Sequence, residues 1–197
     1  MAVSASRDGT LKLWDLVAGR ELRTLVGHTD GVTAVASTSD GRLVVSASAD
    51  QTLKIWELAS GREVATLRGH SHVVSGVALS PNGGVAVSAS WDNTLKFWDL
   101  YSGSNVRTLG VHSDRVSGVA FSADGRSVVS ASVDKTVVFW ELRQGARLAS
   151  FTFDAPVYCC ATGAGRILAG DQAGRVHVLA IEAGGSAQRA NSDLLPN

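Results

Sequence analysis

Histidine, serine and aspartate recur together in this chain, and these residue types are the ones that nucleophilic catalysis uses. A catalytic triad pairs a serine nucleophile with a histidine base that a carboxylate orients. In this chain each group also contains a tryptophan, six residues after the aspartate. The three groups are His28, Ser46 or Ser48, Asp50 and Trp56; His70, Ser88 or Ser90, Asp92 and Trp98; and His112, Ser130 or Ser132, Asp134 and Trp140.

The regular recurrence of these groups argues against an enzyme. An active site needs one nucleophile and one oxyanion site, whereas this set appears three times with equal spacing. No unique acid, base, nucleophile or metal cluster stands apart from it, so we predict no catalytic activity and no cofactor. The structural alternative is that a buried carboxylate is met by donors, because the tryptophan ring nitrogen can only donate.

The elements that must position these residues follow from a repeat of 42 residues, shared by Trp14, Trp56, Trp98 and Trp140. Within residues 29–70, short aliphatic segments alternate with turn signals such as Asp40-Gly41, and Asp-Gly favours tight hairpin turns. The pattern predicts four short strands over residues 32–36, 43–48, 52–57 and 63–67.

A period of about 40–45 residues that carries Gly-His and Trp-Asp marks is typical of WD40 repeats, so the chain resembles the WD40 family over residues 1–182. The resemblance implies an all-β propeller, here of about five blades. It also implies a hydrogen-bond chain in which histidine bonds the turn aspartate and serine connects to tryptophan. We assign to this network His28, Ser48, Asp50 and Trp56; His70, Ser90, Asp92 and Trp98; and His112, Ser132, Asp134 and Trp140.

The two ends of the repeat domain are irregular. Residues 1–28 form an incomplete first blade, 29–70, 71–112 and 113–154 are full repeats, 155–182 form a degenerate blade, and 183–197 are a polar tail or an irregular outer strand. If Asp171 is the turn aspartate of the last blade, His177 takes the tryptophan position. The chain is then a small ring, a fragment of a longer propeller, or part of a shared assembly. Residues 169–178 also resemble the C-terminal repeats of bacterial WD40 proteins.

Positions that differ between otherwise similar copies are the best candidates for binding a partner. The residue before the turn aspartate is Arg7, Ala49, Trp91 or Val133, and Trp91 is the one tryptophan outside the repeat's own tryptophan position. Exposed aromatic residues are common interface anchors, and the resemblance places this position on the face that usually binds partners. The predicted partner-binding residues are Trp91, His72, Arg115, Arg7, Asp30 and Asp114.

Bulk composition excludes several classes of partner. Lys+Arg and Asp+Glu are both 18, which gives no electrostatic footprint for nucleic acid or a membrane surface. We expect no secretory signal, no membrane span and no disulfide between the adjacent Cys159 and Cys160, hence a cytoplasmic setting. We predict a scaffold that binds a protein or peptide; the alternatives are a homo-oligomer formed through an open blade edge, and a C-terminal sensor module of a longer signalling protein.

Overall fold

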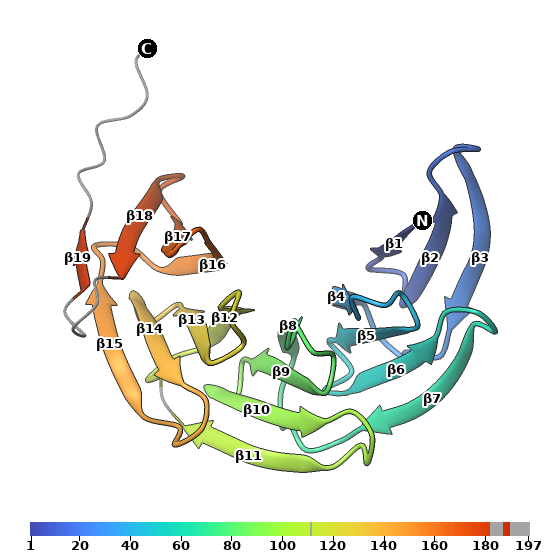
Figure 1. Ribbon diagram of the computed structural model, residues 1–197, viewed down its shortest axis with the longest axis horizontal. Helices are drawn as coiled ribbons and strands as arrows, with labels where there is room; N and C mark the ends of the chain where they lie inside the picture. Colours follow the sequence, from blue (N-terminus) through green and yellow to red (C-terminus); the bar gives the residue numbers. More distant parts are fainter. Residues whose placement is uncertain (111, 182–186, 190–197) are drawn as a thin grey trace.

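The chain folds into five small antiparallel sheets that stand side by side along an open arc (Figure 1). The computed structural model describes residues 1–110, 112–181 and 187–189. Within these ranges every regular element is a strand, and one sheet has three strands while the others have four. The expected all-β fold of about five blades is confirmed, and the described blades do not close into a ring.

Each blade is a run of consecutive strands, numbered here in chain order. Blade 1 comprises β1 (Ala2–Ala5), β2 (Thr10–Asp15) and β3 (Arg20–Val26); blade 2 comprises β4 (Val32–Ser37), β5 (Leu43–Ser48), β6 (Leu53–Glu57) and β7 (Arg62–Leu67). Blade 3 comprises β8 (Val74–Leu79), β9 (Val85–Ser90), β10 (Thr94–Asp99) and β11 (Asn105–Gly110); blade 4 comprises β12 (Val116–Phe121), β13 (Ser127–Ser132), β14 (Thr136–Glu141) and β15 (Arg147–Thr152). Blade 5 comprises β16 (Val157–Gly163), β17 (Arg166–Asp171), β18 (Val176–Ile181) and β19 (Ala187–Arg189). The bounds predicted for the second repeat differ from those of β4 to β7 by at most one residue.

In blades 2 to 5 the turn between the second and third strands has one residue with positive φ, and the β1–β2 turn of blade 1 has an equivalent one. This residue shows how the last blade aligns with the others. It is Gly9 (φ 85), Gln51 (φ 70), Asn93 (φ 68), Lys135 (φ 69) or Gly174 (φ 77). Gly174 follows Lys135 by 39 residues, so blade 5 is shorter than the 42-residue period by three residues at this point.

The predicted alignment of Asp171 with the turn aspartate is therefore wrong. Asp171 pairs with the first residue of β16, as Ser132 pairs with the first residue of β12. An aspartate can hold this turn from the serine position as well, since its Oδ1 accepts the backbone N–H of Ala173 at 2.9 Å. The same register places His177 opposite Ala169, at the position of Val138, and gives the tryptophan position to Leu179.

The last blade also extends beyond its predicted boundary at residue 182. β19 (Ala187–Arg189) pairs with β18, so residues 187–189 of the predicted tail form the outer strand of blade 5. Because backbone hydrogen bonds form this strand without any hydrophobic alternation, the sequence left a polar tail and an irregular outer strand as alternatives, and residues 187–189 follow the second. The other residues of the predicted tail lie outside the described residues.

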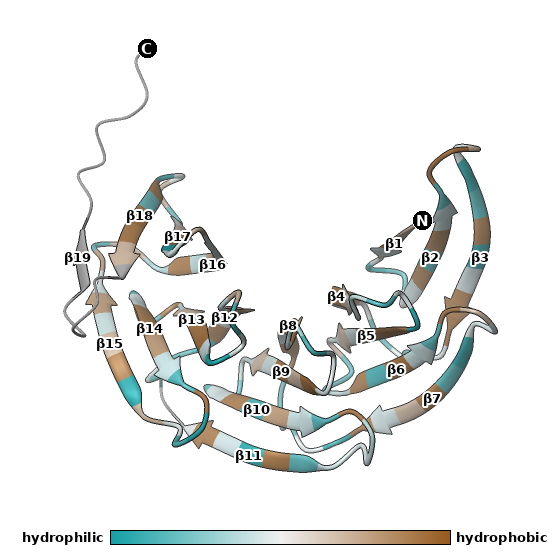
Figure 2. Cartoon of the chain, in the orientation of Figure 1, coloured by the Kyte–Doolittle hydropathy of each residue, from teal (hydrophilic) through white to brown (hydrophobic). Residues whose placement is uncertain are grey.

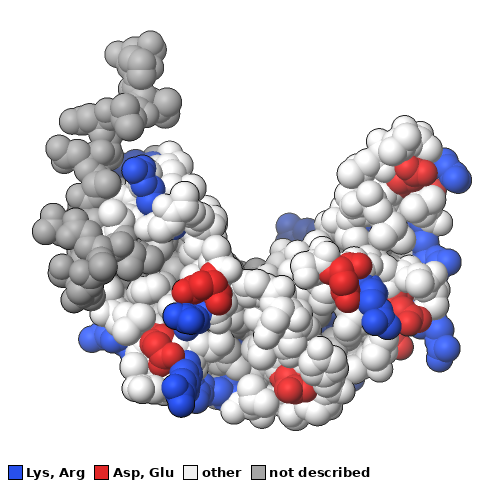
Figure 3. Space-filling model, viewed as in Figure 1, with Lys and Arg blue, Asp and Glu red and all other residues white. Residues whose placement is uncertain are grey.

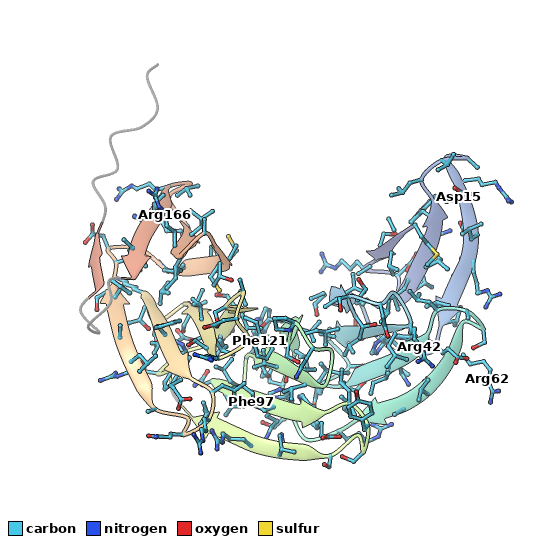
Figure 4. The ribbon with its side chains drawn as sticks, in the orientation of Figure 1. Asp15, Arg42, Arg62, Phe97, Phe121 and Arg166 are labelled. Carbon is cyan, nitrogen blue, oxygen red and sulfur yellow. The ribbon has the colours of Figure 1, made fainter. Side chains whose placement is uncertain are left out.

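Apolar side chains fill the spaces between successive blades. Trp98 of blade 3 packs with Val45, Leu53 and Ile55 of blade 2, and all four are at most 1 % exposed. The outer strands carry both hydrophilic and hydrophobic residues, as Figure 2 shows along β7 and β11. Phe97 and Phe121 lie among the packed side chains, whereas Arg62 extends outward (Figure 4). Hydrophobic burial between blades thus holds the arc together.

A β-bulge at the start of each inner strand connects one blade to the next. The register of β4 against β5 shifts between Val32 and Ala34, and such a bulge re-aims the intervening side chain. The hydroxyl oxygen of this residue, Thr33, lies 3.0 Å from the carbonyl oxygen of Ala47 in its own blade and 2.5 Å from that of Val74 in blade 3, and its one proton is donated between them. Serines repeat this contact in blades 3 and 4.

Candidate functional site

In blades 2, 3 and 4, a buried hydrogen-bond network holds the loop before the inner strand against the middle of the blade. In blade 2, His28 Nδ1 lies 2.7 Å from Asp50 Oδ2, and His28 Nε2 lies 2.7 Å from Ser46 Oγ, which also accepts Trp56 Nε1–H at 2.8 Å. The same contacts, at 2.7–2.9 Å, join His70, Ser88, Asp92 and Trp98 in blade 3 and His112, Ser130, Asp134 and Trp140 in blade 4.

The serine that joins histidine to tryptophan is Ser46, whereas Ser48 is the serine predicted from the sequence. Ser48 Oγ lies 3.0 Å from the carbonyl oxygens of both Asp30 and Gly31, and it accepts the backbone N–H of Asp50 at 3.1 Å. Ser90 and Ser132 make the corresponding loop contacts. The reason is register: Ser46 pairs with Lys54 in the middle of β6, within reach of the tryptophan, whereas the second serine lies at the end of its strand.

Burial and hydrogen bonding fix the charge states of the histidine and aspartate in each network. Burial lowers the pKa of His28 and His70 below the ordinary value, although the adjacent aspartate acts in the opposite direction. Burial alone raises the pKa of Asp50 and Asp92, but hydrogen bonds, first from the threonine two residues later and then from histidine, outweigh it and lower each pKa to about 2. At neutral pH each pair is therefore a neutral imidazole bonded to a carboxylate.

The arrangement is unsuited to nucleophilic catalysis. Ser46, Ser88 and Ser130 are 0 % exposed, so their hydroxyls are out of reach of a substrate. Among the described residues, no group of three or more His, Cys, Asp or Glu side chains could hold a metal ion. Within the same ranges no helix is long and apolar enough to cross a membrane.

Blade 5 replaces the whole network with apolar residues. Its counterparts of histidine, serine and tryptophan are Phe153, Ala169 and Leu179, which pack together in one buried cluster. A different pair, His177 Nε2 and Asp171 Oδ2, lies 2.9 Å apart, and the His177 ring is 4.5 Å from that of Phe153. In blade 1, Trp14 Nε1–H still donates to Ser4 Oγ at 2.8 Å.

Three of the predicted partner-binding residues form one cluster at the boundary between blades 3 and 4. Arg115 Cζ lies 4.5 Å from the ring centroid of Trp91, within the range of a cation–π contact. The His72 ring is tilted against Trp91 with 5.6 Å between centroids. Trp91 remains 37 % exposed, and Asp114 Oδ1 accepts the backbone N–H of Arg115 at 2.7 Å beside it.

Backbone hydrogen bonds hold both sides of this cluster in place. The N–H of Trp91 donates to the carbonyl of Val73 at 2.9 Å, and the carbonyl of Arg115 accepts the N–H of Val133 at 3.0 Å. Equivalent bonds occur at the other full blades, so every blade boundary presents the same two side-chain positions. These pairs of positions are Arg7 and Gly31, Ala49 and Val73, Trp91 and Arg115, and Val133 and Pro156.

The remaining two predicted residues lie at a different boundary. Arg7 contacts Gly31 between blades 1 and 2, where a Cβ on the glycine would come within 3.2 Å of the Arg7 carbonyl oxygen. Asp30 accepts the N–H of Gly31 at 2.6 Å. The structure therefore brings Trp91, His72, Arg115 and Asp114 together at one blade boundary. Arg7 and Asp30 lie at another boundary, between blades 1 and 2.

Tandem blades with a repeated His–Ser–Asp–Trp chain define the class of proteins built from propeller repeats. The family model described as "WD domain, G-beta repeat" matches residues 1–15, 19–57, 61–99 and 103–141, which together make up more than half of the chain. The chain belongs to the WD40-repeat family, whose members generally act as scaffolds for protein interactions.

Individual relatives match only about one repeat. Nuclear distribution protein PAC1-2 of Uncinocarpus reesii is 51% identical over 45 residues, which are 23% of this chain and 10% of the relative. Nuclear distribution protein PAC1 is 49% identical over 45 residues in Arthroderma otae (23% of this chain, 10% of the relative) and 46% over 41 residues in Cryptococcus neoformans (21% and 10%). The matched part spans about a tenth of each relative. None of the three is bacterial, so they give no support to the bacterial resemblance.

Proposed function

We propose that this chain is a non-catalytic scaffold that binds a protein or peptide on the face formed by the loops before the inner strands and the adjacent turns, such as the β9–β10 turn of Trp91. The observation that carries the proposal is the Trp91–His72–Arg115 cluster. It occupies one of four equivalent blade boundaries, and its tryptophan is exposed although four other tryptophans serve the repeat. Arg7, Asp30 and Asp114 lie in loops of the same face and extend the proposed surface.

The rigidity of this face supports the proposal. Trp91 and Arg115 are each bound through their backbones to a neighbouring loop or strand end at 2.9–3.0 Å. The networks of His70 and His112 hold the loops that precede the cluster. A surface fixed before binding loses little conformational entropy when a partner arrives. Aromatic and arginine residues of this kind are enriched in the energetically important part of interfaces.

An array of short peptides of varied sequence tests the scaffold function. We expect the labelled chain to bind a subset of peptides and Trp91→Ala to lose most of that binding, by about 2 kcal/mol or more for a residue at the centre of an interface. Val133→Ala changes the equivalent position at the next boundary and is the matched control. The proposal fails if the chain binds no peptide, or if Trp91→Ala binds as the parent does.

Self-association is a second candidate function, and the exposed faces of the end blades favour it. Leu168 and Val176 of blade 5 are 43 % and 64 % exposed, whereas their counterparts in blade 4, Val129 and Val137, are 0 % exposed under the next blade. At the other end of the arc, Leu16 is 66 % exposed. Exposed apolar faces of this kind mark interaction sites. The partner would then be a second copy of the chain.

The cellular setting of the scaffold is also part of the proposal. Cys159 and Cys160 are both free thiols, and burial raises the pKa of Cys160 to about 12. Adjacent strand residues point to opposite faces, so the two sulfur atoms are poorly placed to bond each other. Free cysteines fit a reducing, cytoplasmic compartment.

A further inference from the structure

The guanidinium of Arg115 stacks on Trp91 and has no hydrogen-bond acceptor among the described residues. It lies over Trp91 at 4.5 Å, and no described residue accepts a bond from its side-chain nitrogens. Arg107 and Lys54, in contrast, do have acceptors: Arg107 Nη1 donates to the carbonyl of Leu142 at 2.7 Å, and Lys54 Nζ lies 2.8 Å from Glu63. Stacking occupies the face of a guanidinium and leaves its N–H edge free for a planar or tetrahedral anion.

His72 adds a second donor beside the same ring. The backbone N–H of Val73 donates to His72 Nδ1 at 2.8 Å, so Nδ1 acts as an acceptor and the ring proton is on Nε2. No described residue bonds that Nε2. Trp91 thus lies between two groups that donate hydrogen bonds, and its own exposed part offers an apolar surface.

We propose that the Trp91–His72–Arg115 cluster binds an anionic side chain of a peptide, a carboxylate or a phosphate monoester, with an adjacent apolar residue packed on Trp91. This inference rests on the proposed scaffold function. Arg115 would donate two parallel N–H bonds to the anion and His72 would donate a third. The equivalent boundary between blades 2 and 3 has Ala49 and Val73 at these positions, so it offers neither the ring nor the cation.

The surroundings favour a single anionic group over a polyanion such as nucleic acid. Asp114 lies directly beside Arg115, and Asp30 occupies the corresponding loop of blade 2. Figure 3 shows cationic and anionic side chains interspersed on the visible face, with no continuous basic surface. The formal net charge is zero. A polyanion would meet carboxylates in several loops, whereas one anionic side chain would meet two donors and the single carboxylate of Asp114.

Pools of fluorescent peptides test the inference. The pools share random flanking residues and carry at the centre glutamate, phosphoserine, glutamine or lysine. Fluorescence anisotropy should show that the intact chain binds the glutamate or the phosphoserine pool about tenfold or more tightly than the glutamine pool, because charge-assisted bonds are the strong ones. Tighter binding of the glutamate pool would show that the bound anion is a carboxylate, and tighter binding of the phosphoserine pool that it is a phosphate. Added sodium chloride should weaken binding of the anionic pools alone.

Three variants separate this inference from the scaffold function. Arg115→Ala should remove the preference for anionic pools, and Arg115→Lys should keep only part of it because lysine lacks the planar fork. Arg126→Ala removes the same charge from an exposed hairpin turn at the opposite ends of the strands and should bind like the parent. Equal thermal melts of all three exclude misfolding.

The outcomes are distinct. If the pools bind equally, Arg115→Ala binds like the parent and Trp91→Ala does not bind, the anion inference is overturned while the scaffold function stands. If no pool binds at all, both are overturned.

Discussion

At the scale of single residues, the aspartate carboxylate accepts more hydrogen bonds than any other group of its network. Asp92 Oδ2 lies 2.7 Å from His70 Nδ1 and accepts the N–H of Ser71 at 3.1 Å. Asp92 Oδ1 accepts both the N–H and the hydroxyl of Thr94, at 3.0 and 2.6 Å. One carboxylate therefore joins the incoming loop, the turn and the third strand of its blade.

We expect Asp92→Ala to lower the free energy of unfolding by about 2–4 kcal/mol, since it leaves the buried His70 and the half-buried Thr94 without their acceptor. Denaturant titration measures this change. Asp8→Ala is the control, because Asp8 occupies the same position in blade 1 but is exposed and bonds only its neighbouring residues, and its loss should be clearly smaller. A melting temperature of Asp92→Ala within about a degree of the parent would contradict the network's role.

The same residues predict how stability depends on pH. The folded-state pKa of each network histidine is lowered, so the unfolded chain binds a proton more readily below about pH 6.5 and stability falls as pH decreases. The pKa of Asp92 is lowered from 3.8 to about 2, so its stabilising contribution is present above pH 3.8 and is lost between pH 3.8 and 2. Urea midpoints should therefore fall steadily from pH 7 to pH 3. A maximum near pH 5 would show that the histidines are not neutral in the folded state.

The sequence identified which residue types form the network, but it did not identify the correct serine by pattern alone. Ser46 and Ser48 are two residues apart and face the same side of β5, so alternation does not separate them. Counting register outward from the turn would have done so, because Ser46 pairs with Lys54, two residues before Trp56. The stacking of Arg115 on Trp91 depends on side-chain rotamers across two blades, which no local pattern reports.

At the scale of strands and blades, blade 5 shows that the network can be replaced as a unit. Phe153, Ala169 and Leu179 take the places of histidine, serine and tryptophan, and Ala173 takes that of the turn aspartate. Replacing all partners of a buried hydrogen bond by apolar groups leaves no polar group unsatisfied, whereas replacing one of them does. The blade therefore keeps its strands after losing the residues that define the repeat.

Restoring one member of the network alone should destabilise blade 5. Ala169 is 1 % exposed and packs with Phe153 and Leu179, so Ala169→Ser would bury a hydroxyl without the loop histidine and the tryptophan that its counterparts in blades 2 to 4 bond. We expect a loss of about 1–3 kcal/mol in the free energy of unfolding, measured by thermal or chemical denaturation. Ala161→Ser, at an exposed position of β16, should stay within about 0.5 kcal/mol of the parent. Equal stabilities of the two variants would contradict the apolar replacement.

The strands of full repeats could be predicted because Asp-Gly turns and aliphatic segments mark both ends of each one. Blade 5 could not be predicted equally well, because it is shorter than the repeat and has an aspartate, Asp171, at the serine position. This position lies two residues before that of the turn aspartate. Asp171 still bonds the turn, so an alignment based on residue type alone mistakes it for its counterpart. The backbone fixes the position here, through the positive φ of Gly174.

At the scale of the whole molecule, the arc has two different exposed ends. Blade 5 presents Leu168 and Val176, which correspond to residues that each inner blade buries under the following one. Blade 1 presents Leu16, whose counterparts Leu58 and Leu100 are 6 % and 8 % exposed under the preceding blade. Such unlike faces suit head-to-tail contacts, which close into a ring or continue as a filament depending on the rotation between subunits.

The solution mass therefore tests self-association, and Val176→Glu tests its location. Light scattering after size exclusion should give a mass above the 20.5 kDa of one chain, and this mass should rise with protein concentration. Val176→Glu places a charge on the exposed face of blade 5 and should return the mass toward one chain, because an unpaired charge resists burial in an apolar contact. Val64→Glu is the matched control, since Val64 is 60 % exposed on β7 in the outer layer of blade 2 and should leave the mass unchanged. A parent chain that stays at 20.5 kDa at every concentration would overturn self-association and leave the loop face around Trp91 as the surface through which this protein acts.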